Sequence, residues 1–200
     1  MERGQPIDRY YIERFLKRQA DDIQGRVLEI GDNVYTRRYG QERVSESIVL
    51  HIAEQKEHVT LIGSLTEQSS IPARSFDCLV VTQTLQFIFD VKTAVRTIHH
   101  ALKPGGVALV TVPGISQISR YDMDRWGHYW SFTTRSVEEL FADVFPCDHL
   151  QIEAHGNVLA AIAFLHGLAS EELRPAELNY VDHDYQLLVT VRAVRPEENQ

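Results

Sequence analysis

The chain has 200 residues, 44% of them hydrophobic, which predicts a single domain (residues 1–200) that buries about 70% of the surface of its unfolded chain. Its 28 acidic and 20 basic side chains give a formal net charge of −8 at pH 7. Because sequence-independent binding to nucleic acid depends on clustered Lys and Arg, we expect no nucleic-acid partner. The first six residues lack the apolar core of a signal peptide, and no apolar run approaches the ~20 residues of a membrane span. We therefore expect a soluble, cytoplasmic protein without a membrane partner.

Hydrophobic periodicity predicts an α/β domain in which short strands alternate with helices. Apolar side chains at helical spacing predict one helix over residues 10–20, within a helical lead-in of residues 1–24, and another over residues 91–102. The β-rich runs predict strands over residues 27–30, 47–52, 59–63, 76–81 and 107–112. Since parallel strands need crossovers of about a dozen residues or more, this alternation predicts a parallel, doubly wound sheet.

The C-terminal half departs from that alternation. Residues 115–134 are polar and aromatic and match neither a strand nor a good helix, so we expect an active-site lid here. A helix over residues 136–145 follows, with Ser136 as its N-cap. The remaining expectations are strands over residues 150–154 and 186–194, an apolar helix over residues 158–168 and a frayed tail over residues 195–200.

The end of the first expected strand carries the most informative pattern. Residues 27–31 (VLEIG) place Glu29 and Gly31 at the carboxyl edge of the sheet, where ligands bind in folds of this kind. A nucleotide-cofactor loop usually continues with glycines at alternate positions, whereas this chain has Asn33 and Tyr35 there. Asn tolerates a left-handed backbone, but the Tyr35 side chain is expected to occupy space close to the path of a cofactor.

Three motifs together resemble those of the class I methyltransferases that use S-adenosylmethionine (SAM). They are residues 27–31 (VLEIG), 76–81 (FDCLVV) and 101–113 (ALKPGGVALVTVP). The most specific part is the helix stop Lys103-Pro104-Gly105-Gly106 before a buried strand. The resemblance covers most of the chain, and it implies a Rossmann-like, seven-stranded, mostly parallel doubly wound sheet with SAM as the cofactor.

The resemblance also implies which positions surround SAM. In the family the first loop approaches the methionine part, an acid after the second strand holds the ribose, and a polar residue after the third strand meets the adenine. Glu54 fits the ribose position only if its turn is shifted by one residue, and Ser64 stands where an aspartate is usual. The cofactor-binding residues implied in this way are Glu29, Gly31, Asp32, Asn33, Glu54, Ser64 and Gln83.

A narrower resemblance concerns residues 130–133 (WSFT) and the helix expected after them. This stretch is similar to methyltransferase-like domains that accompany glycosyltransferases in bacterial polysaccharide pathways. The similarity implies a carbohydrate-type substrate, a role in polysaccharide biosynthesis and a glycosyltransferase as a partner.

Two neighbouring arginines, Arg37 and Arg38, follow the first loop. They are either surface charges or an anion clamp, because the planar guanidinium group suits a carboxylate or a phosphate. A phosphorylated or nucleotide-activated sugar would fit such a clamp.

The expected lid contains both tryptophans of the chain. Aromatic faces interleaved with charged groups suit a sugar ring, whose C–H face stacks while its hydroxyls form hydrogen bonds. The expected substrate-binding residues are Arg37, Arg38, Arg120, Tyr121, Trp126, Tyr129 and Trp130. His128 is the expected general base, since the pKa of histidine lies near neutrality, and Asp122 or Asp124 would orient or replace it. Alternatively, the aromatic side chains only cover an apolar edge of the sheet.

The remaining histidines and both cysteines suggest no further chemistry. Cys78 and Cys147 lack CxxC spacing, which predicts two unpaired thiols, and the histidines lack the spacing of metal ligands. We therefore expect no metal site.

Three functions remain open from the sequence. The first is a SAM-dependent methyltransferase that acts on a carbohydrate or a similar small polar acceptor. The second keeps the fold without SAM binding and acts on a sugar phosphate or another anionic ligand. The third is a non-catalytic module that docks to a glycosyltransferase or forms a homodimer, which predicts an exposed apolar patch.

Overall fold

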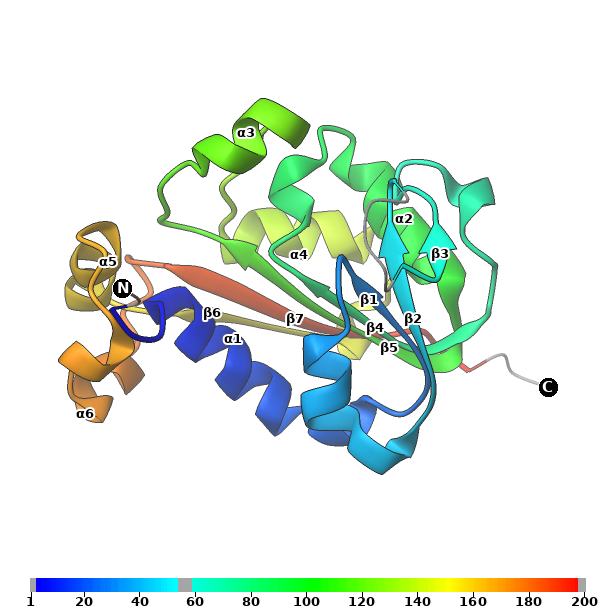
Figure 1. The fold of residues 1–200 in the computed structure, drawn as a ribbon, viewed down its shortest axis with the longest axis horizontal. Helices are drawn as coiled ribbons and strands as arrows, with labels where there is room; N and C mark the ends of the chain where they lie inside the picture. The colour runs from blue at the N-terminus through cyan, green and yellow to red at the C-terminus, as the bar shows by residue number, and fades with distance from the viewer. Residues whose placement is uncertain (1–2, 54–58, 198–200) are drawn as a thin grey trace.

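The computed structural model describes residues 3–53 and 59–197, which form a seven-stranded sheet with helices on both faces (Figure 1). The strands are β1 (Gly25–Ile30), β2 (Val44–His51), β3 (Leu61–Ile62), β4 (Phe76–Thr82), β5 (Leu102–Pro113), β6 (Leu150–His155) and β7 (Leu188–Val194). The α-helices are α1 (Ile7–Arg18), α2 (Val91–Ala101), α3 (Arg120–Trp126), α4 (Thr134–Ala142), α5 (Val158–Leu165) and α6 (Pro175–Asn179).

The strand order is β3-β2-β1-β4-β5-β7-β6. Strands β1 to β5 pair with one another in parallel, whereas β7 runs antiparallel to both β5 and β6. This arrangement confirms the predicted α/β class and the mostly parallel, doubly wound sheet. It also places the carboxyl ends of β1, β2, β4 and β5 along one edge, which is where the expected site residues begin.

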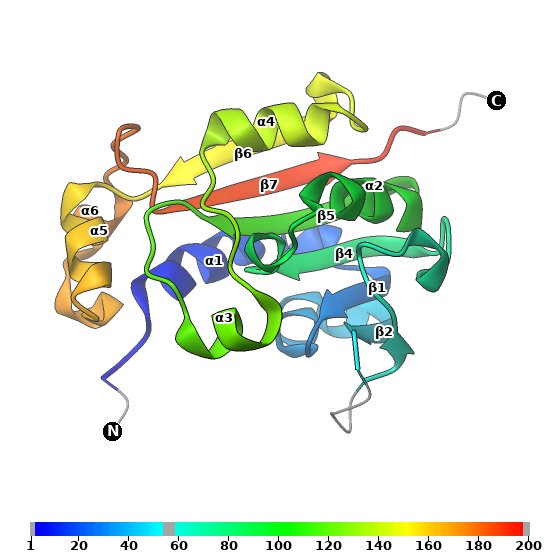
Figure 2. The ribbon, with the colours of Figure 1, turned by 90° about the horizontal axis from the view of Figure 1, so that it is seen from above.

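The sheet is covered on both faces, and this explains the continuous apolar runs of its central strands. In β4, Cys78 and Val80 face one layer while Leu79 and Val81 face the other, and all four are fully buried. Helices α2 and α4 contribute to the core on one face, and α1 and α5 contribute to the core on the other (Figure 2). Cys78 and Cys147 are both free thiols, as predicted.

The predicted lid is only partly irregular, because it contains helix α3. Ser119 caps its first turn by accepting a hydrogen bond from the Asp122 backbone N–H, and Gly127 ends it with φ +84°. No side chain of α3 is buried, so the segment carries no apolar periodicity that would predict a helix. The next helix, α4, is capped by Thr133. The prediction of Ser136 as the N-cap is wrong, because Ser136 is the third residue of the helix and its side chain completes a capping box with Thr133.

The crossover between β1 and β2 is shorter than the alternation of strands and helices predicts. It holds one wide helical turn, Thr36–Gly40, and a 3-10 turn, Gln41–Arg43, in place of a regular helix. A Cβ atom at Gly40 would lie 2.4 Å from a Val44 methyl carbon and 2.8 Å from an Ile23 methyl carbon. Glycine therefore lets this short turn pack tightly between β2 and the start of β1.

Candidate functional site

Glu29 lies at the end of β1, and its side chain is only 2% exposed. One carboxylate oxygen accepts the Thr36 backbone N–H at 2.8 Å, and the other accepts the Tyr35 N–H at 3.2 Å. The carboxylate thus holds the first helical turn after β1 against the end of the strand. Burial raises the pKa of Glu29 from its ordinary value of 4.5 to about 7, although both backbone donors lower it.

This raised pKa predicts a pH dependence of folding. Between about pH 4.5 and 7 the folded protein keeps a proton on Glu29 that the unfolded chain releases. The free energy of unfolding should therefore fall as the pH rises through this window, by on the order of 3 kcal/mol. Urea unfolding of the wild type and of Glu29→Gln at several pH values checks this. As the pH rises, the free energy of unfolding of the wild type should fall relative to that of Glu29→Gln. A difference that stays constant with pH would contradict the raised pKa of Glu29.

The residues after Glu29 form a tight turn. Gly31 has φ +81° and donates its N–H to the Leu50 carbonyl at 2.9 Å. Apart from its chain neighbours, no described atom lies within 4 Å of the position that a Cβ atom on Gly31 would take. Asp32 accepts the Val34 backbone N–H, and the Asn33 amide donates to the Ser47 hydroxyl on β2 at 3.2 Å. Glu29, Gly31, Asp32 and Asn33 are thus brought together, as expected.

The expectation for Tyr35 is wrong. Its ring stacks on that of Tyr39, with centroids 6.2 Å apart, and it packs against the core layer that contains α1. The helical turn held by Glu29 directs the ring to this face, so the tyrosine packs on the α1 side of the sheet.

Tyr35→Gly is therefore expected to lower the free energy of unfolding by about 2 kcal/mol, because a half-buried aromatic ring is lost and a flexible glycine is introduced. It should not improve the affinity for SAM. Urea unfolding and calorimetric titration of the variant test both statements, and stronger SAM binding would show that the tyrosine does obstruct the site.

The two arginines after the loop do not form the expected clamp. Arg38 makes a 2.8 Å ion pair with Glu13 of α1, and its guanidinium lies over the Tyr39 ring at 5.3 Å from the centroid. Its charge is thus neutralised on the α1 side. Arg37 is exposed, and its backbone N–H donates to the Asn33 carbonyl.

Two further expected cofactor residues lie after β2 and β3. Glu54 falls outside the described residues. Ser64 follows β3, and its hydroxyl is 2.8 Å from the Thr66 hydroxyl and accepts the Thr66 backbone N–H. The Ser64 side chain therefore stabilises its own turn.

The loop after β4 presents two glutamines whose polar atoms are incompletely paired. Gln83 has φ +47°, a strained value for a residue other than glycine, and its backbone N–H donates to the Thr111 carbonyl. The Gln86 amide nitrogen donates to Gln83 Oε1 at 3.1 Å. Within the described ranges, buried Gln83 Nε2 and Gln86 Oε1 have no hydrogen-bond partner. Such groups are uncommon in proteins and mark a place where a polar ligand can bind.

The second half of the lid is fixed to this loop. Tyr129 N–H donates to the Gln86 carbonyl at 2.8 Å, and Trp130 Nε1 donates to the Ile88 carbonyl at 3.0 Å. The ring of His128 packs edge-on against Phe87, with centroids 5.3 Å apart. His128 Nδ1 is buried and has no partner among the residues that the structure describes. The predicted base therefore packs against Phe87, the residue that follows Gln86.

The first half of the lid reaches toward the end of β2. Trp126, the last residue of α3, packs edge-on against His51 with centroids 6.2 Å apart. Helix α3 lies beyond the carboxyl ends of the parallel strands (Figure 2). Arg125 lies over the Tyr121 ring at 3.4 Å from its centroid. Both Tyr121 and Arg120 are exposed, as is Asp124, while Asp122 is half-buried.

Phe89 is an aromatic residue of the site that the sequence analysis missed. Its side chain is 71% exposed, and its ring stacks on Trp130 at 6.0 Å and meets Tyr129 edge-on at 5.4 Å. The three rings form an exposed aromatic ledge beside His128. The run of residues 87–89 (FIF) looks like core in the sequence, and only its position after the buried β4 indicates otherwise.

Within residues 3–53 and 59–197, no group of three or more His, Cys, Asp or Glu side chains is arranged to hold a metal ion. In the same ranges, no helix is long and apolar enough to cross a membrane.

Part of the chain matches a known family model. Residues 25–110 match a family model described as a methyltransferase domain, which covers β1 to most of β5. No curated protein matches the chain.

Solved structures show the same fold over nearly the whole chain. The N-methyltransferase NodS from Bradyrhizobium japonicum, in complex with S-adenosylhomocysteine (SAH), has 16% identity and a TM-score of 0.60, covering 96% of this chain and 89% of that one. Phosphoethanolamine N-methyltransferase 2 from Haemonchus contortus has 18% identity and a TM-score of 0.60, covering 96% and 54%. The [4+2]-cyclase SpnF has 17% identity and a TM-score of 0.54, covering 91% and 82%. The chain therefore has the Rossmann-like fold of class I methyltransferases, which by itself does not fix the reaction.

Proposed function

We propose that the protein is a SAM-dependent methyltransferase that acts on a carbohydrate or a similar small polar acceptor. The observation that carries the proposal is the buried Glu29 carboxylate, which lies directly before the left-handed turn at Gly31 at the carboxyl end of β1. The match of residues 25–110 to a methyltransferase domain supports it.

The residues of the first loop fit this cofactor. Once ionised, the buried Glu29 carboxylate supplies a negative charge for the cationic amino group of the methionine part, and Gly31 supplies a left-handed turn without a side chain. Asp32 and Asn33 border the same turn. When bound, SAM supplies an electrophilic methyl group.

The acceptor is proposed to bind between the loop after β4 and the lid. Gln83 and Gln86 offer an unpaired amide donor and an unpaired carbonyl acceptor, which suit a hydroxyl group. The exposed ledge of Phe89, Tyr129 and Trp130 offers aromatic faces for the C–H side of a sugar ring. Polar hydrogen-bonding groups beside aromatic rings favour a carbohydrate over a wholly apolar acceptor.

His128 is proposed to accept the acceptor's proton. His128 Nδ1, which has no partner among the described residues, would accept the proton of the acceptor hydroxyl. SAM, when bound, would supply the methyl group, so that the methyl ether, SAH and protonated His128 would result. The fixed position of His128 against Phe87 orients the base before the acceptor binds.

An acceptor screen tests this function. The purified protein is incubated with SAM and, separately, with free sugars, sugar phosphates, nucleotide sugars and small amines, and SAH release and product mass are measured. Methylation of a sugar hydroxyl is the expected result. Methylation of amines alone would contradict the carbohydrate class, and no transfer despite SAM binding would contradict the enzymatic assignment.

One observation favours the non-catalytic alternative, in which the domain docks to a partner such as a glycosyltransferase. Helix α5 exposes four apolar side chains to solvent: Val158, Leu159, Ile162 and Leu165. An exposed apolar patch is what that alternative predicts. The sugar-phosphate alternative loses support because Glu13 neutralises Arg38.

A further inference from the structure

Strand β6 forms an open edge of the sheet. It is the last strand in the sheet order, and among the described residues it pairs only with β7. An edge strand presents unpaired backbone N–H and C=O groups, which can pair with another strand. Two grooves run beside β6, one reaching the α1 side and one on the α4 side.

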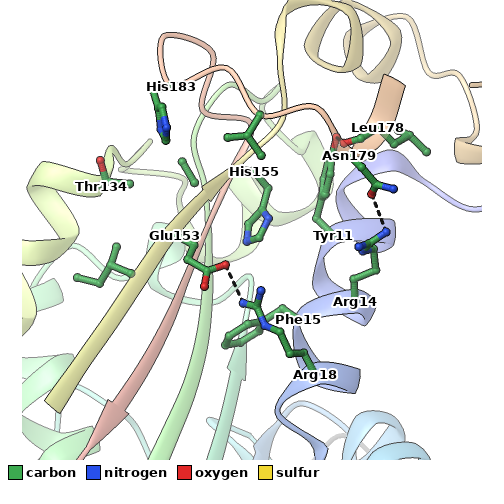
Figure 3. A pocket seen from close by; sticks show the side chains of 13 residues that line it. Tyr11, Arg14, Phe15, Arg18, Thr134, Glu153, His155, Leu178, Asn179 and His183 are labelled. Carbon is green, nitrogen blue, oxygen red and sulfur yellow. Dashed lines mark hydrogen bonds and ion pairs between the residues drawn. The ribbon is translucent and has the colours of Figure 1, made fainter. Parts of the chain in front are cut away.

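The first groove has a volume of about 690 Å³ and follows four consecutive residues of β6, 152–155 (Figure 3). Its floor on the α1 side includes the buried rings of Tyr11 and Phe15. Tyr11 stacks on His155, with ring centroids 5.7 Å apart. The backbone edge of β6 therefore borders a space wide enough for added side chains.

This groove carries a positive charge that the described residues do not neutralise. Arg18 pairs with Glu153 at 2.7 Å. Arg14 donates to Oδ1 of the Asn179 side chain at 2.6 Å and to the Tyr10 hydroxyl at 2.8 Å, and both partners are neutral. No described carboxylate makes an ion pair with Arg14, so the groove favours an incoming acidic side chain on the α1 side.

The second groove, of about 280 Å³, lies on the other face of the same strand. Leu150 and Ile152 of β6 line it, together with Cys147 and the start of α4. A strand added to this edge would therefore need apolar side chains on the α4 side and an acidic side chain on the α1 side, because side chains alternate between the two faces of a sheet.

Strand β6 itself has this pattern. Its α4-side residues are Leu150, Ile152 and Ala154, and Glu153 lies on the α1 side, where it pairs with Arg18. A twofold axis normal to the sheet pairs two copies of β6 antiparallel. The α1 sides of both copies then lie on one face of the joined sheet, and the α4 sides lie on the other. The edge is thus self-complementary, as an interface between two identical subunits must be.

We propose that two copies of this chain associate through antiparallel pairing of β6 with β6 of the second copy, so that the sheet continues from one subunit into the other. Glu153 of the second copy then supplies the carboxylate that Arg14 lacks, and the apolar residues of both strands meet on the α4 side. This interface is independent of the proposed methyl transfer.

Sedimentation equilibrium over a range of protein concentrations tests the proposal. The wild type should reach twice the chain mass, and Glu153→Arg should weaken dimerisation roughly tenfold or more by gathering three cations in one groove. The double variant Arg14→Glu/Glu153→Arg restores opposite charges between position 14 of one copy and position 153 of the other, and it should recover dimerisation. Asp143→Arg is the matched control: Asp143 is 45% exposed and pairs with Arg96, close to the 47% exposure of Glu153, but it lines neither groove.

Hydrogen exchange gives an independent measurement on the backbone. Amides within residues 150–155 should become more protected as the wild-type concentration rises, while those of the variant Glu153→Arg should not. A wild type that stays monomeric at all concentrations would overturn the proposal. So would a dimer that Glu153→Arg leaves intact, or one whose formation leaves the β6 amides unprotected.

Discussion

Replacement of Glu29 by glutamine is expected to weaken SAH binding about thirtyfold, which corresponds to about 2 kcal/mol. The change keeps the shape of the side chain, but it removes the buried negative charge that we propose for the cationic amino group of the ligand. The amide oxygen can still accept one of the two backbone N–H groups of the following turn. The fold should therefore persist, and calorimetric titration with SAH measures the loss of affinity directly.

Asp77→Asn is the matched control for this prediction. Asp77 also accepts a backbone N–H, that of Arg26 at 2.7 Å, and it binds the Lys103 ammonium. It lies near the start of β4, at the amino ends of the parallel strands, whereas Glu29 lies at their carboxyl ends. SAH affinity should be unchanged in this variant. Equal affinities in Glu29→Gln and the wild type would remove Glu29 from the cofactor site.

His128→Ala is expected to reduce the rate of methyl transfer about a hundredfold at saturating acceptor, because general-base catalysis contributes on the order of 10²–10⁴. SAH affinity should stay within about twofold of the wild type, since the proposed role concerns the acceptor proton and not the cofactor. Turnover of the sugar acceptor found in the screen, measured beside SAH titration, separates the two effects.

The neighbouring substitution Tyr129→Phe controls for disturbance of the lid. It keeps the ring that meets Phe89 and the backbone N–H that binds the Gln86 carbonyl. Its rate should remain close to that of the wild type. If His128→Ala retains full turnover, the imidazole is only a packing partner of Phe87 and the base lies elsewhere.

The sheet and the first part of the site could be predicted because their signals are local. Buried parallel strands read as continuous apolar runs, so residues 76–81 predict β4 to within one residue of its observed end. Glu29 and Gly31 end such a run, which places them at the carboxyl edge of the sheet by topology alone. The left-handed turn at Gly31 then follows from the residue type.

The features that sequence reasoning missed depend on contacts between distant residues. Arg38 looks like part of an anion clamp until α1 brings Glu13 to it, 25 positions earlier in the chain. The Tyr35 ring turns toward α1 because Glu29 caps the turn that carries it. Helix α3 buries no side chain, so no periodicity could reveal it. Phe89 resembles a core residue in sequence but is exposed in the structure.

Calorimetric titration of the wild-type chain with SAM and SAH tests the central claim most directly. The buried Glu29 carboxylate, the left-handed turn at Gly31 and the packing of Tyr35 on the α1 side predict micromolar binding of both compounds without any change to Tyr35. If neither SAM nor SAH binds, the result contradicts the proposed methyltransferase function, and the site would have to bind a different ligand.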